Sequence, residues 1–350
     1  MNILDLAKIS PYSLNKIKKD KIFLELFKNL NEYHLKNCKD YKKIFNMIRE
    51  KKIKSISDFP MLPVRIFKDH DLVSIKKENI KKKLFSSGTT SSKRSKIYLD
   101  DENSKIQIKI LSNLITSMFG DQRLPMLILG DERKVKTKKD FDAKKAAISG
   151  FSFYGKNHTY IIENGEICYS KLNDFLNSFG EKKFLLFGFT SDIFEFLIKK
   201  INKDKVISKF DNCILIHGGG WKKLEKFKIS NELFKKKLYS ILGIKKIHNY
   251  YGLVEQTGSI FFECEYGNLH ASIYSDIFIR DKNFNLIENN KIGFIQIISL
   301  LPKSYPGHNL ITEDLGRIKG EDDCKCGRKG KYFEVFGRVK FAEIRGCSNV

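Results

Sequence analysis

The sequence contains no long hydrophobic run, few prolines and an odd number of cysteines. No stretch approaches the roughly eighteen apolar residues of a membrane-spanning helix, so we expect no membrane span. The opening segment "MNILDLAKISPYSLNK" lacks the basic start and small-residue cleavage site of a signal peptide. The seven cysteines are irregularly spaced and cannot all pair within one chain. These absences favour a reducing cytoplasm, where thiols are nucleophiles, metal ligands or plain core residues.

Acidic residues are scarce beside basic ones, with 41 Asp and Glu against 65 Lys and Arg and a net charge of +24. One interpretation is an acidic partner, such as nucleic acid, an anionic membrane, a nucleotide or an acidic carrier protein. The lysines are spread along the chain without a single tract, however, and Ile, Asn and Phe are also abundant. Lysine-rich codon usage therefore explains the charge better, and we do not expect nucleic acid as a partner.

The 350 residues, 41% of them hydrophobic and 30% charged, predict a folded chain with a large core. Residues 20–50 read as one amphipathic helix, because apolar side chains recur at spacings of three and four. Four short apolar runs bounded by glycine follow, as expected of buried parallel strands: "LPMLILG", "KFLLFGF", "NCILIHGGG" and "KKIHNYYG". We expect Thr190 or Ser191 to cap the helix after the second run, and Ser230 and Gly243 to bound the helix after the third.

From about residue 258 the pattern changes to strand-like segments with little helix. The sequence thus predicts an α/β fold with a layered core and a β-rich subdomain. We divide it into an N-terminal helical segment (1–60), an α/β core (61–257), a β-rich subdomain (258–337) and a C-terminal tail (338–350) carrying Cys347.

Two segments contain small residues suited to a nucleotide. In "LFSSGTTSSKRSK", Ser and Thr hydroxyls and the backbone N–H groups of a glycine turn can ring a phosphate, although an ordinary serine-rich surface loop reads the same way. In "HGGGWKK", three glycines after a strand let the backbone approach a ligand closely. Trp221, the only tryptophan, is either a flat surface for that ligand or a core anchor.

Two further segments contribute carboxylates. In "YYGLVEQTG", Glu255 follows a strand and a glycine, where it can reach a metal ion on a nucleotide phosphate. In "LITEDLG", Asp314 can accept both hydroxyls of a ribose. We interpret both segments as turns after strands, where a carboxylate has no packing role.

The order of these motifs, followed by Gly337 and Arg338, resembles that of the adenylate-forming enzymes. Within that superfamily the chain is similar to the bacterial acyl-protein synthetase (LuxE) family, which is related to phenylacetate–CoA ligases. The similar stretches run from about residue 60 to residue 347 and include "SSGTTSSKRSKIYLD", "HGGGWKK", "YYGLVEQTGSIFFEC", "CKCGRKGK" and "GRVKFAEIRGC". The combination is specific, although no single motif is.

The resemblance implies the large domain of an adenylate-forming enzyme that uses ATP and Mg²⁺. The β- and γ-phosphates would be held by Ser86, Ser87, Gly88, Thr89 and Thr90, and the adenine would be flanked by Gly219, Gly220 and Trp221. Tyr251 and Gly252 would lie against the nucleotide and the acyl carboxylate, and Glu255 would reach Mg²⁺. Asp314 would bind the ribose, and Arg338 would lie near that ribose at a domain hinge.

The implied reaction begins with attack of a fatty-acid carboxylate on the α-phosphate, which releases pyrophosphate and leaves acyl-AMP. Only twelve residues follow Arg338, so we expect the mobile C-terminal domain of larger relatives, with its catalytic lysine, to be absent. Lys222 or Lys223 is a candidate replacement, but the alternative that both are surface lysines at a helix start explains them better. Val254 and Ser91 depart from the threonine and glycine that are usual in the superfamily at these places.

The resemblance also gives Cys347 a role, because acyl-protein synthetases carry a C-terminal cysteine that takes the acyl group as a thioester. Arg345 would raise the thiolate fraction. A donor or acceptor protein, a reductase or a carrier, would be the partner. Two alternatives stay open: an acyl-CoA or aryl-CoA ligase, in which coenzyme A accepts the acyl group, and a non-catalytic basic protein.

Three cysteines and a histidine form a separate group: Cys264, His270, Cys324 and Cys326. Three thiolates and one imidazole are a normal set of ligands for structural zinc. The two halves of the group are about sixty residues apart, so the sequence leaves open whether they meet or are scattered reduced cysteines.

Overall fold

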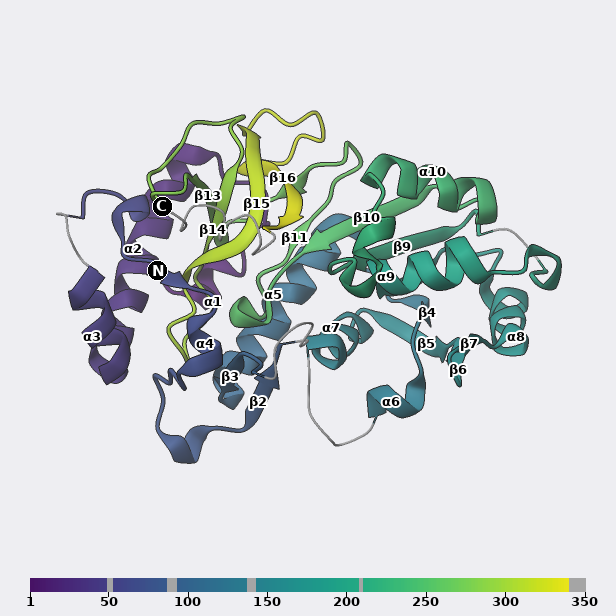
Figure 1. Ribbon diagram of the computed structural model, residues 1–350, viewed down its shortest axis with the longest axis horizontal. Coiled ribbons are helices and arrows are strands. Elements are labelled where there is room, and N and C mark those ends of the chain that lie inside the picture. Colours follow the sequence, from purple (N-terminus) through teal and green to yellow (C-terminus); the bar gives the residue numbers. More distant parts are fainter. Residues whose placement is uncertain (49–52, 87–92, 137–142, 208–209, 340–350) are drawn as a thin grey trace, which may run out of the picture.

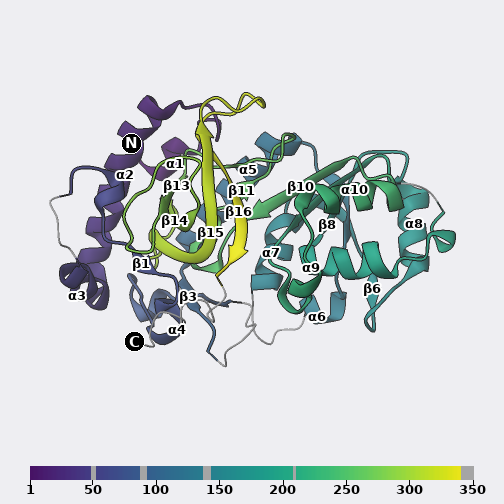
Figure 2. The same ribbon diagram turned by 45° about the horizontal axis from the view of Figure 1, so that its top comes forward.

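The computed structural model describes residues 1–48, 53–86, 93–136, 143–207 and 210–339 (Figure 1). Two six-stranded sheets form the two halves of the molecule, and Figure 2 shows the same division in a second view. The parallel sheet, with α8 and α10 beside it, forms one half. The antiparallel sheet and the N-terminal helices form the other.

The parallel sheet has the strand order β11–β10–β9–β8–β4–β5. Its strands are β4 (Leu124–Ile128), β5 (Gly155–Tyr160), β8 (Phe184–Phe189), β9 (Cys213–Gly218), β10 (Lys246–Tyr251) and β11 (Phe261–Phe262). All neighbours run parallel except β11, which is antiparallel to β10. The four predicted parallel strands are confirmed as β4, β8, β9 and β10. Every residue of β8 and β9 is buried, which explains why both read as unbroken apolar runs.

Helices cover both faces of this sheet. Alternate residues of β4 and β8 belong to two separate hydrophobic clusters, because successive side chains of a strand point to opposite faces. One cluster includes residues of α5 (Asp101–Phe119) and α7 (Ala143–Ser152). The other includes residues of α8 (Tyr169–Phe179), α9 (Thr190–Ile193) with its π-helical continuation η3 (Phe194–Lys200), and α10 (Asn231–Leu242). The result is a three-layered α/β/α arrangement, as expected for the core.

The predicted helix boundaries are partly right. Ser230 caps α10 by accepting a hydrogen bond from the Leu233 N–H at 3.2 Å, and Gly243 ends it with a left-handed φ of 77°. The prediction that Thr190 or Ser191 caps the preceding helix is wrong, since α9 begins at Thr190 without a side-chain cap. The Thr190 hydroxyl instead pairs with Nδ1 of buried His217 at 3.0 Å.

The antiparallel sheet has the order β12–β16–β15–β14–β13, and β1 (Leu62–Pro63) pairs in parallel with β15. Its strands are β12 (Leu269–His270), β13 (Ser275–Arg280), β14 (Gly293–Ser299), β15 (Asn309–Glu321) and β16 (Lys331–Arg338). The interpretation of "LITEDLG" as a turn is wrong, because the segment lies inside β15. Backbone pairing with β14, β16 and β1 keeps it extended.

The N-terminal segment contains α1 (Ile3–Leu6), α2 (Lys16–Asn37) and α3 (Lys39–Ile48). A single helix over residues 20–50 is therefore wrong: Cys38 is extended, with φ −123° and ψ 101°, and separates α2 from α3. The break lets Tyr41 and Phe45 of α3 turn into the core. The apolar spacing continues across Cys38, so the periodicity does not reveal the break.

A buried ion triad attaches α2 to the antiparallel sheet. The Lys19 Nζ lies 3.5 Å from Asp276 Oδ1, and the Lys331 Nζ lies 2.9 Å from Asp276 Oδ2. Farther along α2, the ring of His34 stacks on that of His308 with 4.6 Å between centroids. The N-terminal helices are thus fixed on the antiparallel sheet, which contains Asp314 in β15.

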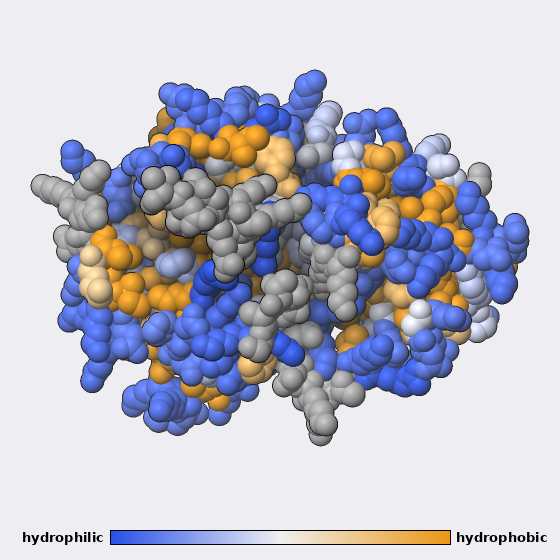
Figure 3. Space-filling view, in the orientation of Figure 1, coloured by the Kyte–Doolittle hydropathy of each residue, from blue (hydrophilic) through white to orange (hydrophobic). Residues whose placement is uncertain are grey.

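The remaining short elements surround the sheets. They are η1 (Ile56–Asp58), α4 (Ile66–Asp69), η2 (Lys77–Asn79), α6 (Glu132–Lys136), η4 (Lys203–Lys205), η5 (Lys222–Phe227), η6 (Val254–Gln256) and two hairpins, β2 (Lys82–Phe85) with β3 (Lys96–Leu99) and β6 (Ile162–Glu163) with β7 (Glu166–Ile167). On the face seen in Figure 3, hydrophilic residues are spread over both halves and hydrophobic ones form separate patches. Over the described ranges, no helix combines the length and the apolar character needed to cross a lipid bilayer.

Candidate active site

The carboxyl ends of β8, β9 and β10 lie at one edge of the parallel sheet, where ligands of such sheets commonly bind. Gly218 ends β9 in a tight place, because an added Cβ would lie 2.6 Å from the ring of Tyr250. Gly219 has a left-handed φ of 80°, which favours glycine. Apart from its chain neighbours, no described residue places an atom within 4 Å of a Cβ built on Gly220, so the described part of the structure leaves space beside this turn.

Trp221 follows this turn, and its indole points into the core. Its ring lies 4.9 Å from that of Phe194 and 6.1 Å from that of Phe234, and the side chain is buried. The alternative of a core anchor is confirmed, and the expectation of an exposed flat surface is wrong. That Trp221 flanks the adenine stays a prediction, and with the indole packed in the core it would have to do so through its backbone.

Tyr251, Asp314 and Arg338 meet at the junction of the two sheets. The Tyr251 hydroxyl at the end of β10 donates a 2.7 Å hydrogen bond to Asp314 Oδ2 in β15. Arg338 is the register partner of Asp314 in β16, and its Nε lies 3.6 Å from Asp314 Oδ1. Burial, reinforced by the Asp314 carboxylate, raises the pKa of Tyr251 well above its usual value, so the phenol stays a donor. The structure thus brings three of the predicted nucleotide residues together.

Glu255 lies in η6, just after β10, and is 6% exposed. Burial raises the pKa of its carboxyl, while a hydrogen bond from the Ser95 side chain and the charges of Arg338 and Lys68 act in the opposite direction. Because these contacts do not fully offset the burial of this carboxylate, it suits a divalent cation. Unlike Asp314, which lies inside β15, Glu255 does follow a strand and a glycine, as predicted.

The base of the predicted phosphate loop lies beside Glu255. The Ser86 N–H donates to the Ser95 carbonyl at 3.1 Å, and the Ser95 N–H donates to Ser86 Oγ at 2.9 Å, which closes the hairpin between β2 and β3. Ser95 therefore both closes this loop and contacts the Glu255 carboxylate. The rest of the predicted loop, Ser87, Gly88, Thr89 and Thr90, lies outside the described residues.

Sequence reasoning missed Ser95, Lys68 and Lys228. Ser95 lies within a run of small polar residues that gives no reason to single it out, and Lys68 and Lys228 are two lysines among many. The Lys228 Nζ donates to the Phe336 carbonyl at 2.7 Å and lies 3.3 Å from Glu225 Oε1, beside Gly337. It thus holds the end of β16 that precedes Arg338.

The side chain of Lys222 and the whole of Cys347 lie outside the described part of the structure. The backbone of Lys222 begins η5, but its side chain, like that of Lys223, is not described. Cys347 follows the last described residue, Val339, whose N–H donates to the Glu313 carbonyl at 3.1 Å.

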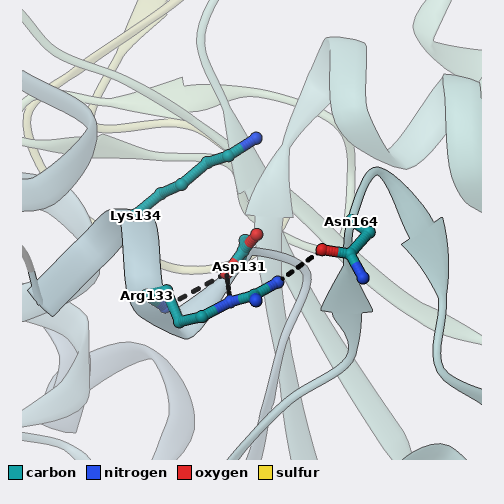
Figure 4. Close-up of a pocket in the computed structure, with 4 residues that line it drawn as sticks. All are labelled: Asp131, Arg133, Lys134 and Asn164. Atoms are coloured by element: carbon teal, nitrogen blue, oxygen red, sulfur yellow. Dashed lines mark hydrogen bonds and ion pairs between the residues drawn. The ribbon is translucent and has the colours of Figure 1, made fainter.

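An open pocket of about 610 Å³ lies farther along the same sheet edge, past the end of β4 (Figure 4). It is lined by Asp131, Arg133, Lys134 and Asn164. An Arg133 guanidinium N–H donates to Asn164 Oδ1 at 2.8 Å, and its Nε lies 3.5 Å from Asp131 Oδ1. Among the residues that the structure describes, none of those predicted for the nucleotide lines this pocket.

The predicted zinc ligands converge in a second place. The ligand atoms of Cys264, His270, Cys324 and Cys326 all lie within 4.8 Å of one another. The sequence had left this convergence open.

Comparison with known proteins decides the family. A family model described as acyl-protein synthetase, LuxE, matches residues 2–350. The chain belongs to the LuxE family. It is 21% identical over 338 residues to the long-chain-fatty-acid–luciferin-component ligase of Vibrio harveyi, with 92% of this chain and 85% of the relative covered. The expected enzyme class, an acid–thiol ligase of the acyl-protein synthetase type, is confirmed.

Solved structures agree with the LuxE assignment at the level of the fold. An open conformation of 2-hydroxyisobutyryl-CoA ligase, in complex with 2-HIB-AMP and CoA, matches with a TM-score of 0.72 at 14% identity, covering 93% of this chain and 76% of that one. ATP-bound MatB from Rhodopseudomonas palustris matches with a TM-score of 0.51 at 13% identity, covering 76% and 49%. The predicted adenylate-forming fold of this LuxE-family chain is confirmed.

Proposed function

We propose that this LuxE-family chain uses ATP and Mg²⁺ to activate a fatty acid or related carboxylic acid as acyl-AMP, and passes the acyl group to a cysteine thiol. The observation that carries the proposal is the meeting of Tyr251, Asp314 and Arg338 at the sheet junction. Glu255 and the base of the serine-rich loop add a second, adjacent group. These residues come from distant parts of the chain, and the order of their motifs is that of adenylate-forming enzymes.

Each group has a distinct task in this proposal. Asp314 accepts the ribose hydroxyls, while Tyr251 and Arg338 hold its carboxylate in place. Gly219, Gly220 and Gly252 let the backbone come close to the nucleotide, and the loop from Ser86 to Thr90 donates to its phosphates. Glu255 is the residue that would hold Mg²⁺, and the ion supplies charge neutralisation on the phosphates.

The chemistry proceeds in two displacements. In the first, a carboxylate oxygen of the acid bonds to the α-phosphorus of ATP, and the bond to pyrophosphate breaks. In the second, a thiolate sulfur bonds to the acyl carbon, and AMP leaves with the electrons of the broken anhydride bond. The mixed anhydride is reactive, so the protein's main work is alignment of the two reactants.

Cys347 is the proposed acceptor thiol, with Arg345 raising its thiolate fraction. The name of the Vibrio harveyi relative pairs a long-chain fatty acid with a luciferin component, and a partner protein such as a reductase or a carrier fits the same logic here. All six cysteines within the described residues are free thiols, which fits a reducing cytoplasm. Lys222 and Lys223 remain candidates for the catalytic lysine of larger relatives.

A second candidate function is an acyl-CoA ligase. It is favoured by one observation, the match to 2-hydroxyisobutyryl-CoA ligase with a TM-score of 0.72. In this alternative coenzyme A, rather than a protein thiol, takes the acyl group, and the adenylating residues keep the same tasks.

Pyrophosphate release across a panel of carboxylic acids of different chain lengths tests the proposal. We expect release to depend on ATP, on Mg²⁺ and on one class of acid. Adding coenzyme A then separates the two acceptors, because only the second candidate produces acyl-CoA. A chain that releases no pyrophosphate with any acid and binds polyanions with a steep salt dependence would be a basic binding protein instead.

A further inference from the structure

The cysteine–histidine cluster lies where the chain passes from one sheet to the other. Cys264 follows β11 at the edge of the parallel sheet, and His270 lies in β12 at the edge of the antiparallel sheet. The turn between them is tight, with the Cys264 N–H donating to the Asn268 carbonyl at 2.9 Å. Cys324 and Cys326 come from the connection between β15 and β16. Two segments that are distant in sequence therefore meet at this corner.

The four ligand atoms lie close to the spacing of a tetrahedral ion's ligands, so small side-chain movements would complete the shell. The Sγ atoms of Cys264 and Cys324 are 4.0 Å apart, and the Sγ of Cys326 is 3.4 Å from Nε2 of His270. Zinc bonds of about 2.0–2.3 Å at tetrahedral angles place neighbouring ligand atoms about 3.3–3.8 Å apart. The gap between the two sulfurs is also far longer than a disulfide bond, which is about 2.05 Å.

The surroundings of the cluster suit a zinc–thiolate centre. Cys264 and His270 are fully buried and Cys324 is nearly so. The Asn268 side-chain amide donates to the sulfur of Cys324 at 3.4 Å. The Arg328 guanidinium contacts the thiol of Cys326 and pairs with Glu265 at 2.9 Å. Three thiolates and one neutral imidazole around Zn²⁺ carry a net charge of −1, which Arg328 offsets.

We propose that Cys264, His270, Cys324 and Cys326 bind one structural Zn²⁺ ion at the corner between the two sheets. Four protein ligands complete a tetrahedral shell and leave no position for a substrate. The site is also remote from Asp314. Tyr332 of β16 pairs with His270 and Arg338 with Asp314, so six positions, about 20 Å of extended strand, separate the two ends.

The ion would join three parts of the chain at this corner. Besides the two segments that supply ligands, residues near the N-terminus pack here. The ring of Tyr12 meets that of His270 edge-on, and the Tyr12 carbonyl accepts a 2.9 Å hydrogen bond from the Lys329 N–H. The Pro11 carbonyl accepts a hydrogen bond of the same length from the Ile273 N–H. Loss of the ion therefore loosens the N-terminal segment together with the connection between β15 and β16.

Elemental analysis of the whole chain, purified from zinc-containing medium without a chelator, is the direct test. We expect one zinc per chain in the wild type and loss of most of it in Cys324→Ser and Cys326→Ser. Cys168→Ser is the matched control, because Cys168 lies outside the cluster and its Sγ contacts the Ser170 hydroxyl at 3.3 Å. It should keep its zinc.

Cobalt substitution of the wild type removes any dependence on how well the variants fold. Exchange of zinc for Co²⁺ should give the visible absorption of a tetrahedral, thiolate-ligated ion, and metal removal should lower the melting temperature. Folded wild-type protein that contains no zinc and shows no such absorption with Co²⁺ would overturn the proposal. Loss of pyrophosphate release in Cys324→Ser at an unchanged melting temperature would overturn its structural character and indicate a catalytic metal.

Discussion

The hydroxyl of Tyr251 donates to the carboxylate of Asp314 across the junction between the parallel and the antiparallel sheet, at 2.7 Å. Tyr251 ends β10 of the parallel sheet. Asp314 lies in the middle of β15, the longest strand of the antiparallel sheet. The candidate ribose site therefore depends on how the two halves are packed, and variants at either residue test that packing together with the chemistry.

Asp314→Ala should lower kcat/KM for acyl-AMP formation about 100-fold, because hydrogen bonds to a charged group contribute about 1.5–3 kcal/mol each. It should also cost about 1–3 kcal/mol of folding free energy, since it leaves the partly buried Tyr251 hydroxyl without this acceptor. Pyrophosphate release and urea unfolding measure the two effects. Asp314→Asn is the control, because it keeps an acceptor for Tyr251 and should recover most of the stability. Full activity in Asp314→Ala would remove this residue from the site.

Glu255→Gln should reduce adenylation by about 1,000-fold or more, because a metal ligand contributes several kcal/mol of charge stabilisation. The amide keeps the size of the side chain and can still accept from Ser95, so the melting temperature should change little. Pyrophosphate release titrated with Mg²⁺ makes the comparison, and the variant should need far more metal. Unchanged Mg²⁺ dependence and normal acyl-AMP formation would argue against this metal site.

Cys347→Ser should separate adenylation from acyl transfer. The adenylating groups lie before residue 339, so pyrophosphate release should persist, while covalent retention of a labelled acyl group should fall to background. A serine hydroxyl is almost never ionised near neutral pH and attacks slowly without an adjacent base. Neutral hydroxylamine should release the wild-type label, as expected of a thioester. A hydroxylamine-labile label that survives in Cys347→Ser would identify another thiol as the acceptor.

Acid should destabilise the half that contains the antiparallel sheet and the N-terminal helices, through the buried pair His34 and His308. Burial lowers the pKa of His34 to about 3 and also lowers that of His308, so the folded chain holds both rings neutral. The unfolded chain takes up protons below its ordinary histidine pKa of about 6.5. Stability is therefore complete above that value and falls as the pH drops below it, by about 2 kcal/mol per ring between pH 7 and pH 5. Urea unfolding at both pH values, with His34→Gln showing a smaller loss, checks the sign and the size.

Asp276→Ala should destabilise the protein strongly, by about 3–5 kcal/mol, because it leaves Lys19 and Lys331 buried without their shared anion. Lys19→Met is the paired comparison. It leaves one cation with one anion and should cost clearly less. Equal losses in the two variants would mean that the triad contributes through packing rather than charge.

The parts of the fold that the sequence predicted are those specified by local chemistry. The strands β8 and β9 are buried on both faces and read as unbroken apolar runs, and α10 carries its own cap and stop residues. Cys38 and β15 were missed because tertiary packing decides them: apolar spacing continues across Cys38, and strand pairing extends the polar segment around Asp314.

The candidate site likewise contains residues that sequence motifs predicted and residues whose contacts depend on tertiary packing. Glu255 and Asp314 were found from the order of their motifs. Ser95 was missed because its contact with Glu255 exists only after the β2–β3 hairpin has packed beside η6. The Trp221 ring points into the core because it packs against Phe194 and Phe234. Both residues are distant from it in the sequence, so no local pattern encodes this direction.

The hydrogen bond from the Val339 N–H to the Glu313 carbonyl fixes the point from which the proposed acceptor thiol of Cys347 can reach. Eight residues lead from Val339 to Cys347, and eight residues of backbone span at most about 29 Å. Because Glu313 is the neighbour of Asp314 in β15, that radius is centred almost on the proposed ribose site. A thiol confined to such a sphere has an effective concentration on the order of millimolar. The rate of acyl capture should therefore not depend on added small thiols until their concentration is also on the order of millimolar.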